Sequence, residues 1–83
     1  MHEVTVLAAR YTPPLLGDVG LASVVWSERD PLTQTYARHL YVVPVYNGAL
    51  PHPDEDAGMR MLPPNVLEYL VLVLPDGPEE DAP

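Results

Sequence analysis

The 83-residue sequence predicts one mainly β domain, either a small barrel or a strongly twisted antiparallel sheet of four to five strands. Three observations predict this class. The apolar runs are short, valine and tyrosine are frequent in them, and prolines separate one run from the next. The runs cover residues 3–11, 19–28, 29–47 and 66–74. The rival class is an α+β fold with one helix at about residues 31–40.

The first two runs favour strands. Two sets of side chains alternate in residues 3–11 and are expected on opposite faces, with Val4, Val6 and Ala8 on one face and Thr5, Leu7 and Ala9 on the other. Residues 12–18 form a loop that begins near two prolines. Residues 19–28 hold the only tryptophan of the chain at their centre. We predict that Trp26 anchors the core.

The third run has two interpretations. The sequence from Asp30 to Thr33 fits a type I turn, with proline at its second position, and this turn would join residues 21–29 to 34–43 as a hairpin. Asp30 followed by Pro31 also fits the start of a helix. The β-branched and aromatic residues of 33–43 favour the hairpin. Pro44 cannot donate to a ladder, so it marks a strand end, a bulge or a sheet edge.

The last run is also ambiguous. Residues 66–74 lie between Pro63-Pro64 and Pro75, and their three valines and one tyrosine favour a strand over a helix capped by Asn65. The sequence of residues 47–58 predicts a loop. We therefore expect one domain over residues 1–75, followed by an acidic tail over residues 76–83 that cannot fold alone.

The charge of the chain is concentrated in two places. The formal net charge is −8, from 12 acidic residues and four arginines. Asp54, Glu55 and Asp56 form one acidic cluster, and the tail holds four more acids. The remaining five acids and four arginines nearly balance. Because the rest of the chain is nearly neutral and apolar, charge repulsion does little to prevent its association with other proteins.

Few residues offer catalytic or metal chemistry. The chain has no cysteine or lysine nucleophile, no glycine-rich phosphate loop, and no serine in a nucleophile-elbow pattern. The carboxylates after His52 suit hard cations but lack the alternating ligands and glycine of a calcium loop. We therefore expect no enzyme activity, no cofactor and no metal site.

Two classes of partner are also disfavoured. Four arginines without lysine give no basic stripe for nucleic acid. No apolar run approaches the length of a membrane span, and the first residues lack the basic start of a signal peptide. We expect a protein in the cytoplasm or within an assembled particle. The absence of Lys, Ile and Phe, whose places Arg, Val, Leu, Ala and Pro take, indicates a GC-rich bacterium or phage as the source.

The strongest functional signal is that residues 40–43 and 70–74 are apolar on both faces of a strand. In so short a chain, either another chain covers the second face, or the strands close into a small barrel with Tyr41 and Tyr46 at its rim. We favour cover by another chain. We expect a non-catalytic assembly or interaction protein, such as a phage-type structural or decoration subunit or an accessory subunit of a bacterial complex, that forms a homo-oligomer or joins a larger assembly. The alternative is an acidic inhibitor that mimics DNA. The expected partner-binding residues are Tyr41, Val43, Tyr46, Asp54, Glu55 and Asp56.

Overall fold

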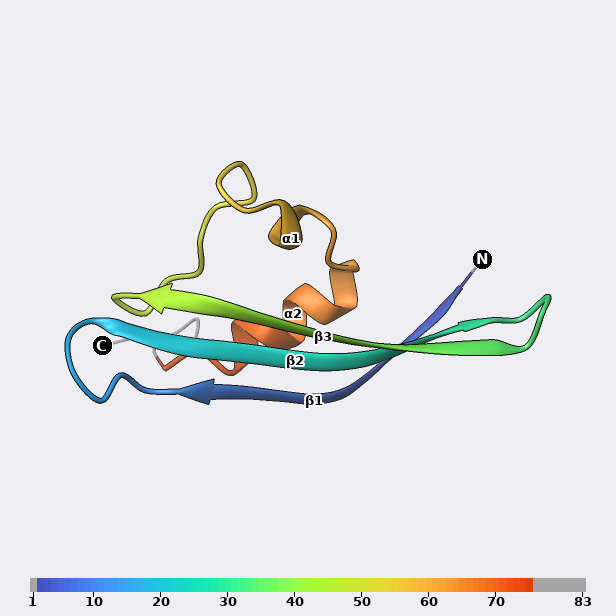
Figure 1. The fold of residues 1–83 in the computed structure, drawn as a ribbon, viewed down its shortest axis with the longest axis horizontal. Coiled ribbons are helices and arrows are strands. Elements are labelled where there is room, and N and C mark those ends of the chain that lie inside the picture. Colours follow the sequence, from blue (N-terminus) through green and yellow to red (C-terminus); the bar gives the residue numbers. More distant parts are fainter. Residues whose placement is uncertain (1, 76–83) are drawn as a thin grey trace, which may run out of the picture.

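The computed structural model describes residues 2–75, and the acidic tail expected at 76–83 lies outside the described residues. Three antiparallel strands form one open sheet in the order β1-β2-β3, followed by two short helices (Figure 1). The strands are β1 (Glu3–Thr12), β2 (Val19–Asp30) and β3 (Thr35–Tyr46). The mainly β class is confirmed. Within residues 2–75 the sheet has fewer strands than the four to five expected, and it does not close into a barrel.

A β-bulge divides β1 into two halves. Val6 pairs with Trp26 of β2, but the next pair joins Ala8 to Val25, so Leu7 has no partner. After the bulge, Ala9 rather than Ala8 turns toward the core. The expectation that Ala8 shares a face with Val6 is therefore wrong, because a single extra residue reverses the side on which every later side chain lies.

A hairpin joins β2 and β3 where the sequence predicts one, which rules out the alternative helix at residues 31–40. The N–H that closes on the Asp30 carbonyl is that of Gln34 rather than that of Thr33, so the turn is one residue wider than the expected type I turn. The N–H of Leu32 donates to the Asp30 side chain at 3.0 Å, and the N–H of Gln34 donates to the Asp30 carbonyl at 2.7 Å. Gln34 adopts a positive φ of 58°, which lets β3 start directly at Thr35. The far end of this hairpin extends well past the helices (Figure 1).

A second tight turn reverses the chain after β3. Asn47 and Gly48 have φ values of 52° and 80°, as a two-residue type I′ turn requires. Tyr46 and Ala49 exchange two backbone hydrogen bonds of 3.0 and 2.9 Å across it. Residues 49–63, which contain the helix α1 (Ala57–Arg60), then rise over the β3 side of the sheet (Figure 1). We call residues 49–63 the arch.

The last run folds as the helix α2 (Pro64–Leu72), so the strand expected at 66–74 is wrong. Pro64 occupies the first turn, where its missing N–H costs nothing. Val66 and Leu70 are completely buried four residues apart on one helical face. Burial of that face against the sheet outweighs the modest preference of valine for strands.

The core lies between one face of the sheet and the two helices. It consists of Ala22, Val24, Trp26, Val43, Val45, Met59, Val66 and Leu70. Trp26 is 8% exposed, which confirms the prediction that it is a core residue. We call this side of the sheet the covered face and the opposite side the open face.

Candidate functional site

The open face of the sheet carries apolar side chains that no other described element covers. On β3, Leu40 and Val42 are 66% and 49% exposed, and on β2 Leu21 is 49% exposed. The registers place Leu21 beside Pro44 and Val25 beside Leu40 on this face. Along β3 the side chains of Leu40, Val42 and Pro44 follow one another on this face. On β2, Leu21 and Val25 extend the apolar surface on either side of Ser23. Exposed apolar surface of this extent is typical of an interaction site.

Three of the four arginines share the open face. The registers of β1, β2 and β3 place Arg10, Arg29 and Arg38 there by strand alternation, together with Glu3. Arg29 Nη1 binds Glu3 Oε1 at 3.0 Å. Three arginines and one glutamate give this face +2, and since the whole chain carries −8, the rest carries −10. The open face is therefore both apolar and locally cationic in an acidic protein.

The two outer strands, β1 and β3, differ in whether the backbone N–H and C=O groups at their outer edges have hydrogen-bond partners. Tyr46 exchanges its backbone hydrogen bonds with Ala49, on the side away from β2. Because backbone groups alternate along a strand, the N–H and C=O groups of the even-numbered residues 36–42 also point away from β2. Pro44 has the same parity, so its missing N–H removes no bond to β2.

We call the outward backbone groups of the even-numbered residues 36–42 the free edge. Within residues 2–75, none of the backbone or side-chain hydrogen bonds beyond the sheet ladder uses these groups. On the opposite edge, the Asn65 side chain donates to the Val4 carbonyl at 3.3 Å. The β1 edge is thus partly satisfied by α2, whereas the β3 edge is available.

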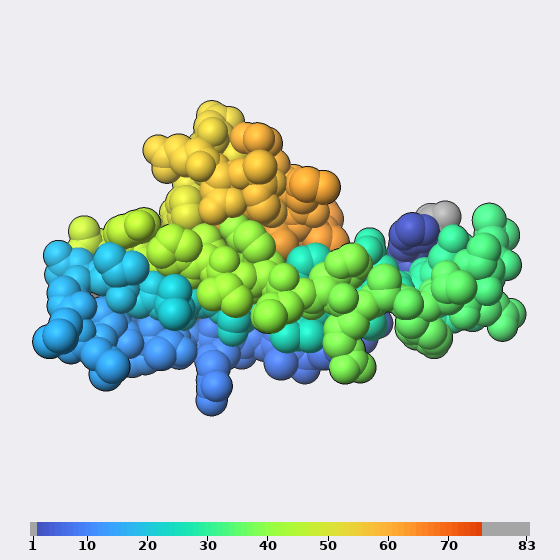
Figure 2. Space-filling model, viewed as in Figure 1, coloured from blue at the N-terminus to red at the C-terminus, as the bar shows by residue number. Residues whose placement is uncertain are grey.

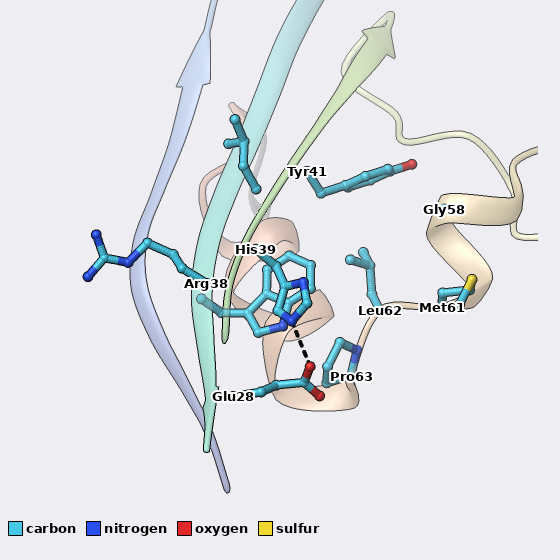
Figure 3. A pocket seen from close by; sticks show the side chains of 10 residues that line it. Glu28, Arg38, His39, Tyr41, Gly58, Met61, Leu62 and Pro63 are labelled. Carbon is cyan, nitrogen blue, oxygen red and sulfur yellow. Dashed lines mark ion pairs between the residues drawn. The ribbon is translucent and has the colours of Figure 1, made fainter. Parts of the chain in front are cut away.

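A cavity of about 520 Å³ adjoins the free edge. Figure 3 shows His39, Tyr41, Leu62 and Met61 around it, while the labelled side chain of Arg38 points away. The wall opposite β3 comes from the arch, and Trp26 lies at the cavity's inner side. The complete lining is Trp26, Glu28, Arg38, His39, Leu40, Tyr41, Gly58, Met61, Leu62 and Pro63.

The polar end of the cavity is built around Glu28. Its Oε1 lies 2.7 Å from Nε2 of His39, and its Oε2 lies 3.9 Å from Nδ1 of His2. The His39 ring stacks on Trp26 with centroids 5.2 Å apart and an interplanar angle of 26°. The His39 contact has ion-pair distance without hydrogen-bond geometry, and the buried Nε1 of Trp26 has no acceptor within residues 2–75. The polar end of the cavity therefore presents the Glu28 carboxylate, whereas the indole N–H of Trp26 is buried without an acceptor in the described part of the chain.

Tyr41 and Asp56 fasten the arch to β3. The phenol of Tyr41 donates to Asp56 Oδ1 at 2.9 Å, and the same oxygen accepts the backbone N–H groups of Gly58 and Met59 at 2.8 and 3.2 Å. Burial, and then the hydrogen bond and negative charge of Asp56, raise the pKa of Tyr41 to about 12. A Cβ at Gly58 would collide with the Tyr41 ring, so glycine allows this close approach.

The structure separates the residues expected to bind a partner. Tyr46 is exposed on the open face, and Asp54 and Glu55 are exposed on the arch. Val43 is completely buried, and Tyr41 and Asp56 bind each other, so these three hold the fold together. On β3 the exposed apolar neighbours are instead Leu40 and Val42.

Sequence reasoning missed three features. The asparagine-glycine pair at 47–48 is a strong signal for a type I′ turn. Asp56 followed by a short apolar segment is an N-cap signal for α1. The third feature is the pairing of Glu28 with His39, which arises from the β2–β3 register and has no local signal.

No protein-family model, curated protein or solved structure matches this chain. Within residues 2–75, no group of three or more His, Asp or Glu side chains is placed to hold a metal ion. Neither helix of that segment, at four and nine residues, has the length or hydropathy to cross a bilayer.

Proposed function

We propose that this chain is a non-catalytic assembly protein whose open sheet face binds a second copy of the chain. The single observation that carries the proposal is the uncovered apolar surface of β2 and β3 around Leu21, Leu40 and Val42. A subunit of a larger particle, such as a phage-type structural or decoration protein, fits this description, as does an accessory subunit of a bacterial complex. The cytoplasm or such a particle is the proposed location.

The size of the face supports a stable contact. Strands of 10 and 12 residues, with a rise of about 3.3 Å per residue and a spacing of about 4.8 Å, give a face roughly 35–40 Å long and 10–15 Å wide. These dimensions give a footprint of roughly 350–600 Å², a large part of the roughly 800 Å² per partner of a standard protein interface.

The distribution of charge supports a head-to-tail contact over a symmetric one. Two open faces stacked on each other would bring six arginines together, which opposes that arrangement. The arch, with Asp54 and Glu55 exposed, is negatively charged, whereas the open face has a net positive charge. A contact between the open face of one copy and the arch of the next is heterologous, and it either closes into a ring or continues as an array.

Charge exchange tests this proposal. In sedimentation velocity at tens of micromolar, we expect the wild-type chain to be larger than a monomer and to dissociate with added salt. The double variants R10E/R38E and D54R/E55R should each be monomeric alone. Mixing the two should restore association, because the first then has an acidic open face and the second a basic arch.

Glu68→Arg is the matched control, since it changes one charge on the exposed side of α2. It should leave association unchanged. A clean 9.1 kDa species for the wild-type chain would contradict self-assembly. Association that survives in both double variants would contradict the head-to-tail contact.

A further inference from the structure

We propose that the cavity beside β3 binds an extended peptide segment with a lysine or arginine side chain, which pairs with the free edge as an added strand. This site is separate from the open face and does not depend on the proposed self-assembly. Two observations carry it: the direction of the unpaired backbone groups, and the negative charge at the cavity's end beside an apolar wall.

The backbone of β3 identifies an extended chain as the occupant. The free edge presents alternating N–H and C=O groups along residues 36–42, and Arg38 and Leu40 line the cavity. The side chain of Arg38 points away from the cavity, so its backbone borders it (Figure 3). An added strand matches such a row of donors and acceptors, which is the basis of β-strand addition. Pro44 ends the row, because it has no N–H to donate.

The shape of the edge limits how far the added strand reaches. The arch stands beside the later part of β3, where Tyr41 binds Asp56 (Figure 1). Figure 2 shows the surface falling away from the arch and the start of α2 toward the hairpin, which leaves that part of β3 open. The added segment therefore lies along residues 36–40 and ends in the cavity.

The side chains of the cavity specify what the peptide presents. Trp26 lines the cavity with its ring, whereas its indole Nε1 is buried and out of reach of a bound peptide. Met61, Leu62 and Pro63 form an apolar wall for a side chain two residues from the basic one. Glu28 at the polar end, with Asp30 further along β2, attracts a cationic side chain in a protein that already carries −8.

The test uses the full chain labelled with ¹⁵N and a blocked heptapeptide of alternating threonine and valine with lysine at its centre. The chain has one tryptophan, so its single indole N–H signal reports on the cavity directly. We expect this signal to shift on titration, and we expect the amides of Arg38 and Leu40 to become protected from exchange. Binding should be visible by about 1 mM peptide, which corresponds to about −4 kcal/mol.

Three matched controls separate this site from general attraction to an acidic protein. A peptide with the same charge but N-methylated on alternate residues should not bind, because it cannot pair with an edge. Replacing its lysine by norleucine should weaken binding about tenfold. Glu28→Gln should weaken binding of the lysine peptide by the same factor, whereas Glu68→Gln on α2 should leave it within about twofold.

The norleucine peptide removes the contact between the peptide lysine and Glu28 without altering the protein. The test therefore still works if the Glu28 variant fails to fold. Equal affinity for the N-methylated peptide would overturn strand addition. An unmoved indole signal at saturating peptide, or shifts confined to Leu21 and Val25 of the open face, would overturn the location.

Discussion

Val42 and Val43 are neighbours on β3 with opposite surroundings. Val43 points to the covered face and is completely buried, whereas Val42 points to the open face and is 49% exposed. The two residues have the same chemistry and the same strand, so their difference arises only from what lies over each face. Two helices cover one side of the sheet, and within residues 2–75 nothing covers the other. The comparison shows that hydrophobicity in this strand serves folding on one side and stays exposed on the other.

The largest expected effect belongs to the covered face. Trp26→Ala removes the largest side chain of the core and its stacking on His39, and it should lower the free energy of unfolding by roughly 3–5 kcal/mol. Thermal unfolding followed by circular dichroism measures this. Val25→Ala, the adjacent residue on the open face, is the control. If both variants have the melting temperature of the wild-type chain, the covered face is not the core.

Paired substitutions of the two valines test the comparison directly. Val43→Ala should cost about 2 kcal/mol, because two buried methyl groups and their packing are lost. Val42→Ala should change the stability of the monomer by less than about 0.5 kcal/mol. Urea unfolding at low protein concentration measures both. Equal costs would mean that something covers the open face even in the isolated chain.

Removal of the cap on α1 should have an intermediate effect. Asp56→Ala leaves two backbone N–H groups and the Tyr41 phenol without their acceptor, and it should cost about 1–2 kcal/mol. Asp54→Ala, on the exposed part of the arch, should be nearly neutral. Chemical denaturation of the two variants gives the difference. A neutral Asp56 variant would show that the arch is held by its apolar contacts alone.

The raised pKa of Tyr41 predicts a loss of stability in alkali. The folded chain holds this proton more tightly than the unfolded chain, whose tyrosine has the ordinary pKa of 10.0. The stabilisation is therefore complete below pH 10 and is lost as the pH rises toward about 12. Ultraviolet titration of the phenolates should show one of the five tyrosines ionising later than the rest. Tyr41→Phe should abolish the late step.

The smallest expected effect is that of the tail. Deletion of residues 76–83 should change the free energy of unfolding by less than about 0.5 kcal/mol, as a surface change does. The deletion removes four negative charges, so it should slow association with a basic surface and flatten its salt dependence. Binding kinetics at two salt concentrations test this. A large loss of stability would show that the tail is part of the fold.

The sequence predicts much of the sheet because its signals are local. Alternation marks β1, the valines around Trp26 mark β2, and Asp30-Pro31 marks the hairpin turn. The helix α2 is misjudged because Val66 and Leu70 are equally spaced for a buried strand and a buried helix. What decides between them is whether the residues meet a neighbouring strand or a sheet face, and that contact is not local.

The site is harder to predict than the fold. That β3 is apolar on both sides is visible in the sequence, and so is the exposed acidic segment at 54–55. The exposure of Leu40 and Val42 depends on where the helices pack, and the gathering of arginines on one face depends on the β1–β2 register. The cavity depends on the path of the arch, which the hydrogen bond of Tyr41 to Asp56 and the packing of Met59 and Leu62 on the core fix together.

The unpaired Leu7 makes β1 a strand with two phases. Before it, even-numbered residues face the core, and after it odd-numbered residues do. Deletion of Leu7 would bring the two halves into a single phase without changing any pairing: Val6, Ala9 and Tyr11 would still face the core, and Arg10 would keep its place on the open face. The bulge therefore lets β1 lose one residue at this position without moving a side chain to the other face of the sheet.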